Sequence, residues 1–90
     1  MVKSVKSEFG KEIGKITHFF DKISVAVIEL KAGLKLGEKI RIKGATTDFE
    51  MPVISMQVEH EQLKEAKKGM AIGMKVKYVV RPNDIVFLVK

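Results

Sequence analysis

The chain has no cysteine. This absence excludes disulfide bonds, thiolate nucleophiles and cysteine-ligated zinc. It suits a reducing compartment, and we expect a cytoplasmic protein. No stretch approaches the roughly 18 consecutive apolar residues that a membrane-spanning helix needs, and the N-terminal segment from Met1 to Lys6 lacks the apolar centre of a signal peptide. We therefore expect no association with a membrane.

Nucleotide-binding motifs are also missing. The segment nearest to a P-loop runs from Gly10 to Ile16, but only three residues separate its glycines, and Ile16 stands where a hydroxyl is required. The backbone amides of a P-loop wrap a phosphate and its hydroxyl holds magnesium, so neither change is compatible with that role. We expect no bound nucleotide.

Catalytic and metal-ligating residues are sparse. His18 and His60 are the only histidines, and His60 lies between Glu59 and Glu61. Adjacent residues of a strand point to opposite faces, so these three side chains do not converge on one ion, and a solvated turn explains them better. The serines show no nucleophile-elbow spacing. We expect no metal, no cofactor and no enzyme, although an enzyme built on either histidine stays open as the least supported alternative.

Positive charge is in excess. Lys and Arg number 17 against 11 Asp and Glu, which gives a formal net charge of +6. Such a balance favours anionic partners, namely RNA, DNA or an acidic protein surface, although a merely soluble basic protein would show it too. With 90 residues the chain is long enough for one small core and one domain.

Short segments rich in β-branched and apolar residues recur along the chain, separated by turn residues. The helical signal is confined to Glu61–Lys68, which has only two apolar residues. This pattern favours an all-β fold, namely a small six-stranded antiparallel closed β-barrel with one short helical turn, with a compact sandwich as the alternative. The domain spans residues 13–90, and residues 1–12 form an N-terminal arm. The predicted strands are Ile13–Phe20, Ile23–Leu30, Glu38–Lys43, Phe49–Val58, Met70–Val80 and Ile85–Val89.

A resemblance to a known family rests on the segment from Ser55 to Lys77. Its serine-bearing strand, acidic turn, leucine, acidic-alanine pair and glycines resemble the second, β-barrel domain of translational GTPases, most closely that of elongation factor Tu. Gly33 and Gly37 match the turns between earlier strands of that barrel. The matching positions in the segment are Ser55, His60, Glu61, Leu63, Glu65, Ala66, Gly69, Gly73 and Val76.

The resemblance implies a translation-factor-type barrel that stands alone, without the GTPase domain. In that family the barrel contacts RNA, the ribosome or a neighbouring domain. The first hypothesis is thus a non-catalytic module that binds RNA or a ribosome component. The alternative is a protein-interaction barrel that docks on a partner enzyme and binds no nucleic acid.

Basic residues spaced by two supply the candidate site. Lys39, Arg41 and Lys43, here called the basic stripe, share one face of a predicted strand with about 7 Å between successive positions, close to the phosphate spacing of an extended nucleic-acid strand. Contacts of this kind give affinity without reading sequence. A solvated barrel exterior is the alternative. The full predicted nucleic-acid-binding set is Lys39, Arg41, Lys43, Lys75, Lys77 and Arg81.

Overall fold

The structure is a computed structural model and describes residues 10–89. In this range the chain is entirely β, which confirms the predicted class, and every strand pairing is antiparallel. The strands are β1 (Lys11–Phe20), β2 (Val25–Leu30), β3 (Leu34–Lys35), β4 (Lys39–Lys43), β5 (Asp48–Pro52), β6 (Gln57–Val58), β7 (Glu61–Gln62), β8 (Glu65–Ala66), β9 (Ala71–Lys75) and β10 (Ile85–Val89).

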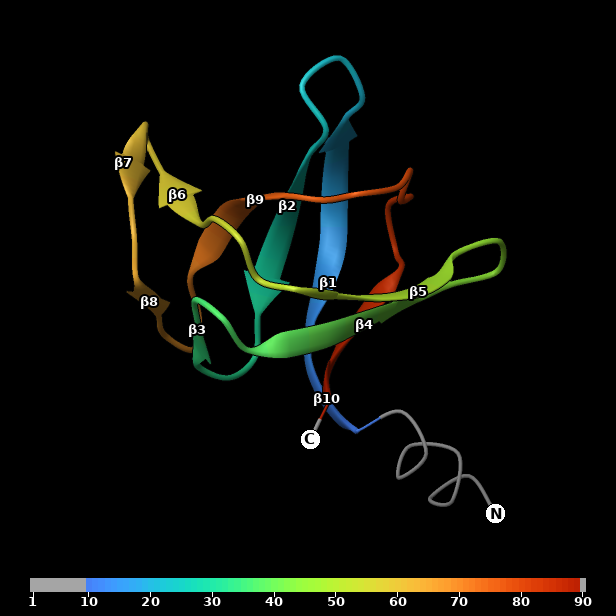
Figure 1. The fold of residues 1–90 in the computed structure, drawn as a ribbon, viewed down its shortest axis with the longest axis horizontal. Coiled ribbons are helices and arrows are strands. Elements are labelled where there is room, and N and C mark those ends of the chain that lie inside the picture. The colour runs from blue at the N-terminus through green and yellow to red at the C-terminus, as the bar shows by residue number, and fades with distance from the viewer. Residues whose placement is uncertain (1–9, 90) are drawn as a thin grey trace.

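Eight of these strands form one sheet in the order β5-β4-β10-β1-β2-β9-β6-β7, and β3 pairs with β8 in a separate ribbon. The large sheet curls around the core (Figure 1). Within residues 10–89 its two outer strands, β5 and β7, do not pair with each other, so the prediction of a six-stranded closed barrel is wrong. β5 ends at Pro52, which has no N–H to donate, although Val53 N–H still donates to Glu38 O at 2.8 Å.

The helical turn predicted over Glu61–Lys68 is replaced by β7 and β8. Glu59 and His60 adopt positive φ angles of 49° and 69°, the combination of a primed hairpin turn, and join β6 directly to β7. Two turns of helix are marginal in water without tertiary support. In this structure strand pairing replaces the helical turn, because Ala66 of β8 is buried opposite Leu34 of β3.

The start of the domain is set by β1. Residues 1–9 of the predicted N-terminal arm lie outside the described residues, whereas Lys11 and Glu12 pair with Leu88 and Phe87 of β10. Register shifts after Glu12 and after Ile16 mark bulges in this strand. Bulges increase the local twist, which helps a ten-residue strand to follow the curled sheet.

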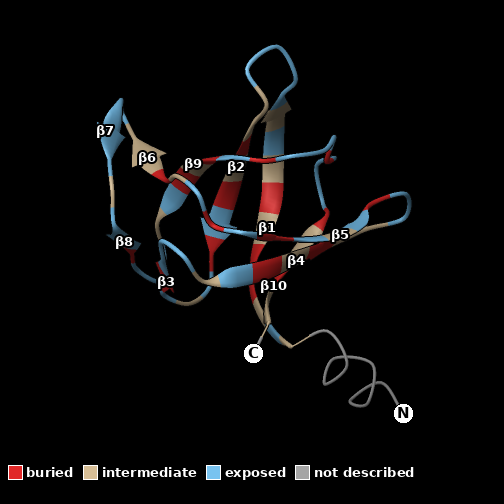
Figure 2. Cartoon of the chain, viewed as in Figure 1, coloured by how far each residue is buried: buried red, intermediate tan, exposed pale blue. Residues whose placement is uncertain are grey.

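The core is aliphatic and lies inside the curl (Figure 2). Ile40 and Ile42 of β4 are fully buried, as the alternation predicts, and each such side chain contributes on the order of 1.5–3 kcal/mol relative to an exposed one. Leu34 is buried too, whereas Leu36 is 40% exposed. Leu36 lies beyond the end of β3, where the chain turns away from the core.

Candidate functional site

The basic stripe lies on the outer face of β4. Lys39, Arg41 and Lys43 point away from the core, while Ile40 and Ile42 between them point into it. The neighbouring strand β5 places carboxylates directly across the ladder, with Glu50 opposite Arg41 and Asp48 opposite Lys43. The cations of the stripe therefore face anions of their own sheet.

These cations and carboxylates form a network of ion pairs. Arg41 donates from Nε and Nη2 to Asp48 Oδ1 and Oδ2 at 2.8 and 3.0 Å. Lys39 Nζ lies 3.2 Å from Glu50 Oε1, and Lys43 Nζ lies 3.6 Å from Asp48 Oδ2. A bidentate guanidinium–carboxylate pair is the best-defined of such contacts. The geometry accounts for the stripe as one side of a cross-strand ion-pair ladder.

The other three predicted cations do not extend the stripe. Lys75 ends β9 opposite Val25 of β2, and β10, β1 and β2 lie between β9 and β4 in the sheet. Lys77 and Arg81 lie on the connection from β9 to β10. Arg81 Nε donates to Thr46 Oγ1 at 3.0 Å, which ties this connection to the β4–β5 turn. The structure thus separates the six residues into two groups.

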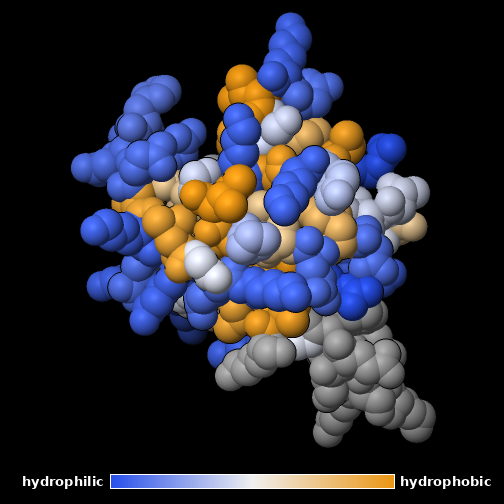
Figure 3. All heavy atoms as spheres, in the orientation of Figure 1, coloured by the Kyte–Doolittle hydropathy of each residue, from blue (hydrophilic) through white to orange (hydrophobic). Residues whose placement is uncertain are grey.

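An exposed apolar surface lies beside the second group. Phe20, Ile23, Tyr78 and Val79, here called the apolar band, expose 52%, 56%, 61% and 64% of their surface. They come from the β1–β2 hairpin and from the connection after β9. Figure 3 shows apolar atoms in orange beside the hydrophilic tip of this hairpin. Sequence reasoning placed Phe20 and Tyr78 in strands and did not single out the band.

Three shallow grooves join the members of the band. The first, of about 400 Å³, is lined by Phe20 and Ile23, and the second, of the same size, by Phe20 and Val79. The third, of about 280 Å³, is lined by Tyr78 and Val79. Because Phe20 lines the first two and Val79 the last two, the band is continuous. Phe49 contacts Tyr78 edge to face, with 5.0 Å between ring centroids, and supports its far end.

The floor of the first groove is the outer face of β2 and β9. Val25 and Val27 are only half-buried there, and Gly73 lies opposite Val27 in the ladder. A Cβ atom at Gly73 would lie 3.3 Å from Val25 Cγ1, so a side chain here would fill the floor of the groove. The missing side chain keeps the groove open to an apolar group from outside.

The two histidines lie at separate places on the surface. His18 is exposed and stacks on Phe20 with 6.5 Å between ring centroids, and His60 occupies the β6–β7 turn at the edge of the first groove. Between residues 10 and 89 no group of three or more His, Asp or Glu side chains is arranged to hold a metal ion. The described part of the chain also holds no helix that would cross a bilayer.

Similar sequences are named as proteases. No family model matches the chain. It is 46% identical over 80 residues to an uncharacterized protease of Methanocaldococcus jannaschii, a match that covers 88% of this chain and 20% of that protein. It is 34% identical over 74 residues to a collagenase of Porphyromonas gingivalis, with 80% of this chain and 20% of the collagenase covered. The chain thus spans about a fifth of the length of these relatives.

Solved structures with the same fold carry a related name. The C-terminal domain of the Geobacillus thermoleovorans "putative U32 peptidase" superposes with a TM-score of 0.83 at 14% identity, over 89% of this chain and 93% of that one. Its selenomethionine variant gives a TM-score of 0.82 at 15% identity, over 86% and 98%.

These likenesses correct the family suggested by the sequence. The relatives are named as a protease and a collagenase, so the resemblance to elongation factor Tu, and the translation-factor and RNA-binding functions that it implied, are wrong. The assignment of the six basic residues as a binding site stays a prediction. The chain is similar in sequence to a part of proteins named as proteases, and its fold is that of a peptidase's C-terminal domain.

Proposed function

We propose that this chain is a non-catalytic docking domain that packs against the catalytic part of a U32-type peptidase, through the apolar band. The observation that carries the proposal is the band itself. Four large apolar side chains stand more than half exposed on one continuous surface. A contiguous exposed apolar patch on a small domain marks an interaction surface more often than chance.

The greater length of the relatives supports a protein partner for this chain. The relatives named as protease and collagenase are about five times as long as the matched segment, so in them a domain of this kind shares a chain with other parts. An interface between domains of one protein typically has an apolar centre and a polar margin. The band fits such a centre, because apolar residues line most of its grooves.

A chimera tests the proposal. The matching segment of the Methanocaldococcus jannaschii protease is replaced by residues 10–89 of this chain, and hydroxyl-radical footprinting compares the chimera with the free 90-residue chain. If the band docks, Phe20 and Tyr78 react several-fold more slowly in the chimera. Leu36 and Ile54, which are 40% and 52% exposed but line none of the three grooves, are the matched controls and keep their rates.

Equal reactivity of Phe20 and Tyr78 in the two samples overturns the proposal, provided the chimera unfolds cooperatively. Protection by added gelatin alone, with no protection in the chimera, also overturns it and assigns the band to a collagenous substrate. If the chimera does not fold, the free chain is mixed with the protease lacking its matching segment, and the same footprints are read. A failure to protect the band in that mixture counts against docking when the truncated protease unfolds cooperatively.

A further inference from the structure

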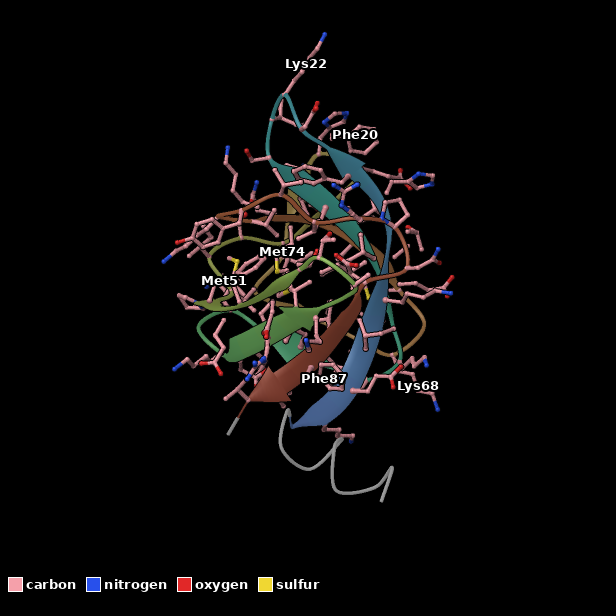
Figure 4. The ribbon with its side chains drawn as sticks, turned by 90° about the vertical axis from the view of Figure 1, so that its right-hand side faces the viewer. Phe20, Lys22, Met51, Lys68, Met74 and Phe87 are labelled. Atoms are coloured by element: carbon pink, nitrogen blue, oxygen red, sulfur yellow. The ribbon has the colours of Figure 1, made fainter. Side chains whose placement is uncertain are left out.

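The end of β1, residues Thr17–Phe20, has a neighbouring strand on one side only. On the β10 side the last backbone bonds are those of Ile16, whose N–H donates to Asp84 O and whose carbonyl accepts from Asn83 N–H, both at 2.8 Å. Beyond them no strand of residues 10–89 pairs with β1 on this side. Figure 4 shows β1 continuing past the start of β10 toward Phe20. We call Thr17–Phe20 the β1 edge, which is about 13 Å long at the usual rise of a strand.

The β1 edge lacks the features that protect the two outer strands of the sheet. β5 carries carboxylates held in ion pairs and ends at Pro52, and β7 consists of two exposed polar residues, Glu61 and Gln62. The β1 edge reads Thr-His-Phe-Phe, with no proline and no Asp, Glu, Lys or Arg. An unpaired strand edge of this composition is a template for a further strand.

The second groove lies along this unpaired side. Its lining consists of His18–Asp21 at the end of β1 and Val79–Pro82 of the β9–β10 connection. Pro82 directly precedes Asn83, which bonds to Ile16, so the groove is on the β10 side of β1. A space of about 400 Å³ is therefore open beside main-chain groups that have no neighbouring strand.

A partner that covers the apolar band also covers the β1 edge, because Phe20 belongs to both. Burying main-chain N–H and C=O groups without hydrogen-bond partners costs free energy and would offset the gain from apolar contact. The main-chain groups of a helix are bonded within the helix and cannot meet this need. An extended segment presents a matching row of donors and acceptors.

We infer that the part of the partner in the second groove is an extended segment that pairs with the β1 edge as an added strand, an inference that rests on the proposed docking function. His18 and Phe20 are exposed on one face of β1 and stack on each other. Cross-strand neighbours lie about 4.5–5.5 Å apart, so the added strand places apolar side chains at alternate positions beside Phe20. Main-chain bonds then give affinity, and these side chains give specificity.

Amide hydrogen exchange in the chimera tests the inference. Exchange is read residue by residue by mass spectrometry, in the chimera and in the free 90-residue chain. In the free chain, amides of the β1 edge that point away from β2 should exchange rapidly. In the chimera they should slow by on the order of tenfold or more as they bond to the added strand. The control is the β7 edge, Glu61 and Gln62, which lines none of the three grooves and should keep its rates.

A backbone ester separates hydrogen bonding from simple burial. An amide-to-ester replacement, made at the residue of the β1 edge whose exchange slows, removes one N–H and keeps the side chain. The ester chain is mixed with the protease lacking its matching segment, and docking should weaken about threefold to tenfold. The matched control is the same replacement at Ile54, which is 52% exposed, lines none of the grooves and donates no backbone bond within residues 10–89. Where this mixture does not bind, exchange in the chimera decides.

The outcomes separate this inference from the proposed function. If footprinting shows Phe20 and Tyr78 protected in the chimera while exchange at the β1 edge is unchanged, the added strand is wrong and docking stands. Equal effects of the two esters also overturn the added strand. Slow exchange at the edge of the free chain overturns it too: slowing that disappears on dilution assigns the edge to a second copy, and slowing at every concentration shows that the chain pairs this edge itself. If the chimera protects neither Phe20 nor Tyr78, the proposed function fails.

Discussion

Gly44 and Asp84 show how a single missing side chain positions a turn. The carboxyl group of Asp84 is buried and accepts a hydrogen bond from the Arg81 backbone N–H at 2.9 Å, which closes the turn before β10. A Cβ atom at Gly44 would lie 1.9 Å from Asp84 Oδ1 and 2.5 Å from its Cγ, so only glycine fits against this carboxyl group. The contact fastens the β4–β5 turn to the start of β10.

We predict that Gly44→Ala destabilises the protein by about 1–3 kcal/mol, because the new methyl group must displace a buried carboxyl group that holds a turn. Urea unfolding followed by circular dichroism measures the change. Gly33→Ala is the control, since a Cβ there would meet only Ala66 O at 3.5 Å, an ordinary contact. An equal effect of the two substitutions would show that Asp84 gives way at no cost.

Single residues also explain which parts of the site the sequence reveals. Alternation of Ile40 and Ile42 with the basic stripe correctly predicts which residues of β4 face inward. The predicted strand Met70–Val80 is too long, because β9 ends at Lys75 and Tyr78 lies on the connection that follows. A sequence pattern shows neither where a ladder ends nor that Phe20 and Val79, far apart in sequence, line one groove.

At the scale of elements, the β4–β5 pair is held on its outer face by charge. The basic stripe and the carboxylates of Asp48 and Glu50 lie across one ladder, and among residues 10–89 β5 has no second neighbour in the sheet. An edge strand with charged, paired side chains is a poor template for another chain, which limits aggregation. The ladder therefore protects an edge as well as fixing its register.

Asp48→Asn should reduce the free energy of unfolding by less than about 1 kcal/mol at 0.1 M salt, because the ion pairs that it breaks are exposed to solvent. The deficit should shrink at 1 M salt, where the Debye length is about 3 Å. Urea unfolding at both salt concentrations gives the measurement. Asp21→Asn, at an exposed carboxylate with no ion pair within residues 10–89, is the control and should have no salt-dependent effect. A salt-independent loss at Asp48 would indicate hydrogen bonding rather than charge.

The resemblance to elongation factor Tu was wrong because it rested on strands and turns that many β folds share. Glycine turns and short apolar strands are shared by many small β folds, so the matching spacing from Ser55 to Lys77 carried little information about family. Within it, the helical signal of Glu61–Lys68 is local, whereas the pairing of Ala66 with Leu34 joins residues far apart in the chain. The all-β class was predictable from composition and spacing; closure and strand order were not, because they depend on such distant pairings.

At the scale of the whole molecule, one aliphatic core and one exposed apolar band serve different purposes. The core lies within the curled sheet, and the band lies outside it on two connections. A domain of this size has a total stability of roughly 5–15 kcal/mol, so loss of a single core contact is a large fraction of it. The band, in contrast, is exposed in the isolated chain and adds little to folding.

Phe20→Ala with Val79→Ala should therefore lower the unfolding free energy by about 1 kcal/mol or less, whereas Ile40→Ala should lower it by about 2–5 kcal/mol. Thermal and urea unfolding of the free chain provide the comparison. Ile40 is fully buried, and Phe20 and Val79 are more than half exposed. If the double variant lowered the unfolding free energy as much as Ile40→Ala does, the band would be needed to fold the chain rather than to bind a partner.

The central place of β10 has a consequence for synthesis. This strand is the last of the described strands, yet it lies between β4 and β1. In the described sheet it alone links the β4–β5 pair to β1, β2, β9, β6 and β7. A nascent chain that has emerged only as far as Asp84 holds two sheet fragments with unpaired edges, and such edges invite misassembly. Pairing of the two fragments must therefore wait until residues 85–89 clear the ribosome, and deletion of this short segment would leave the two fragments without their common strand.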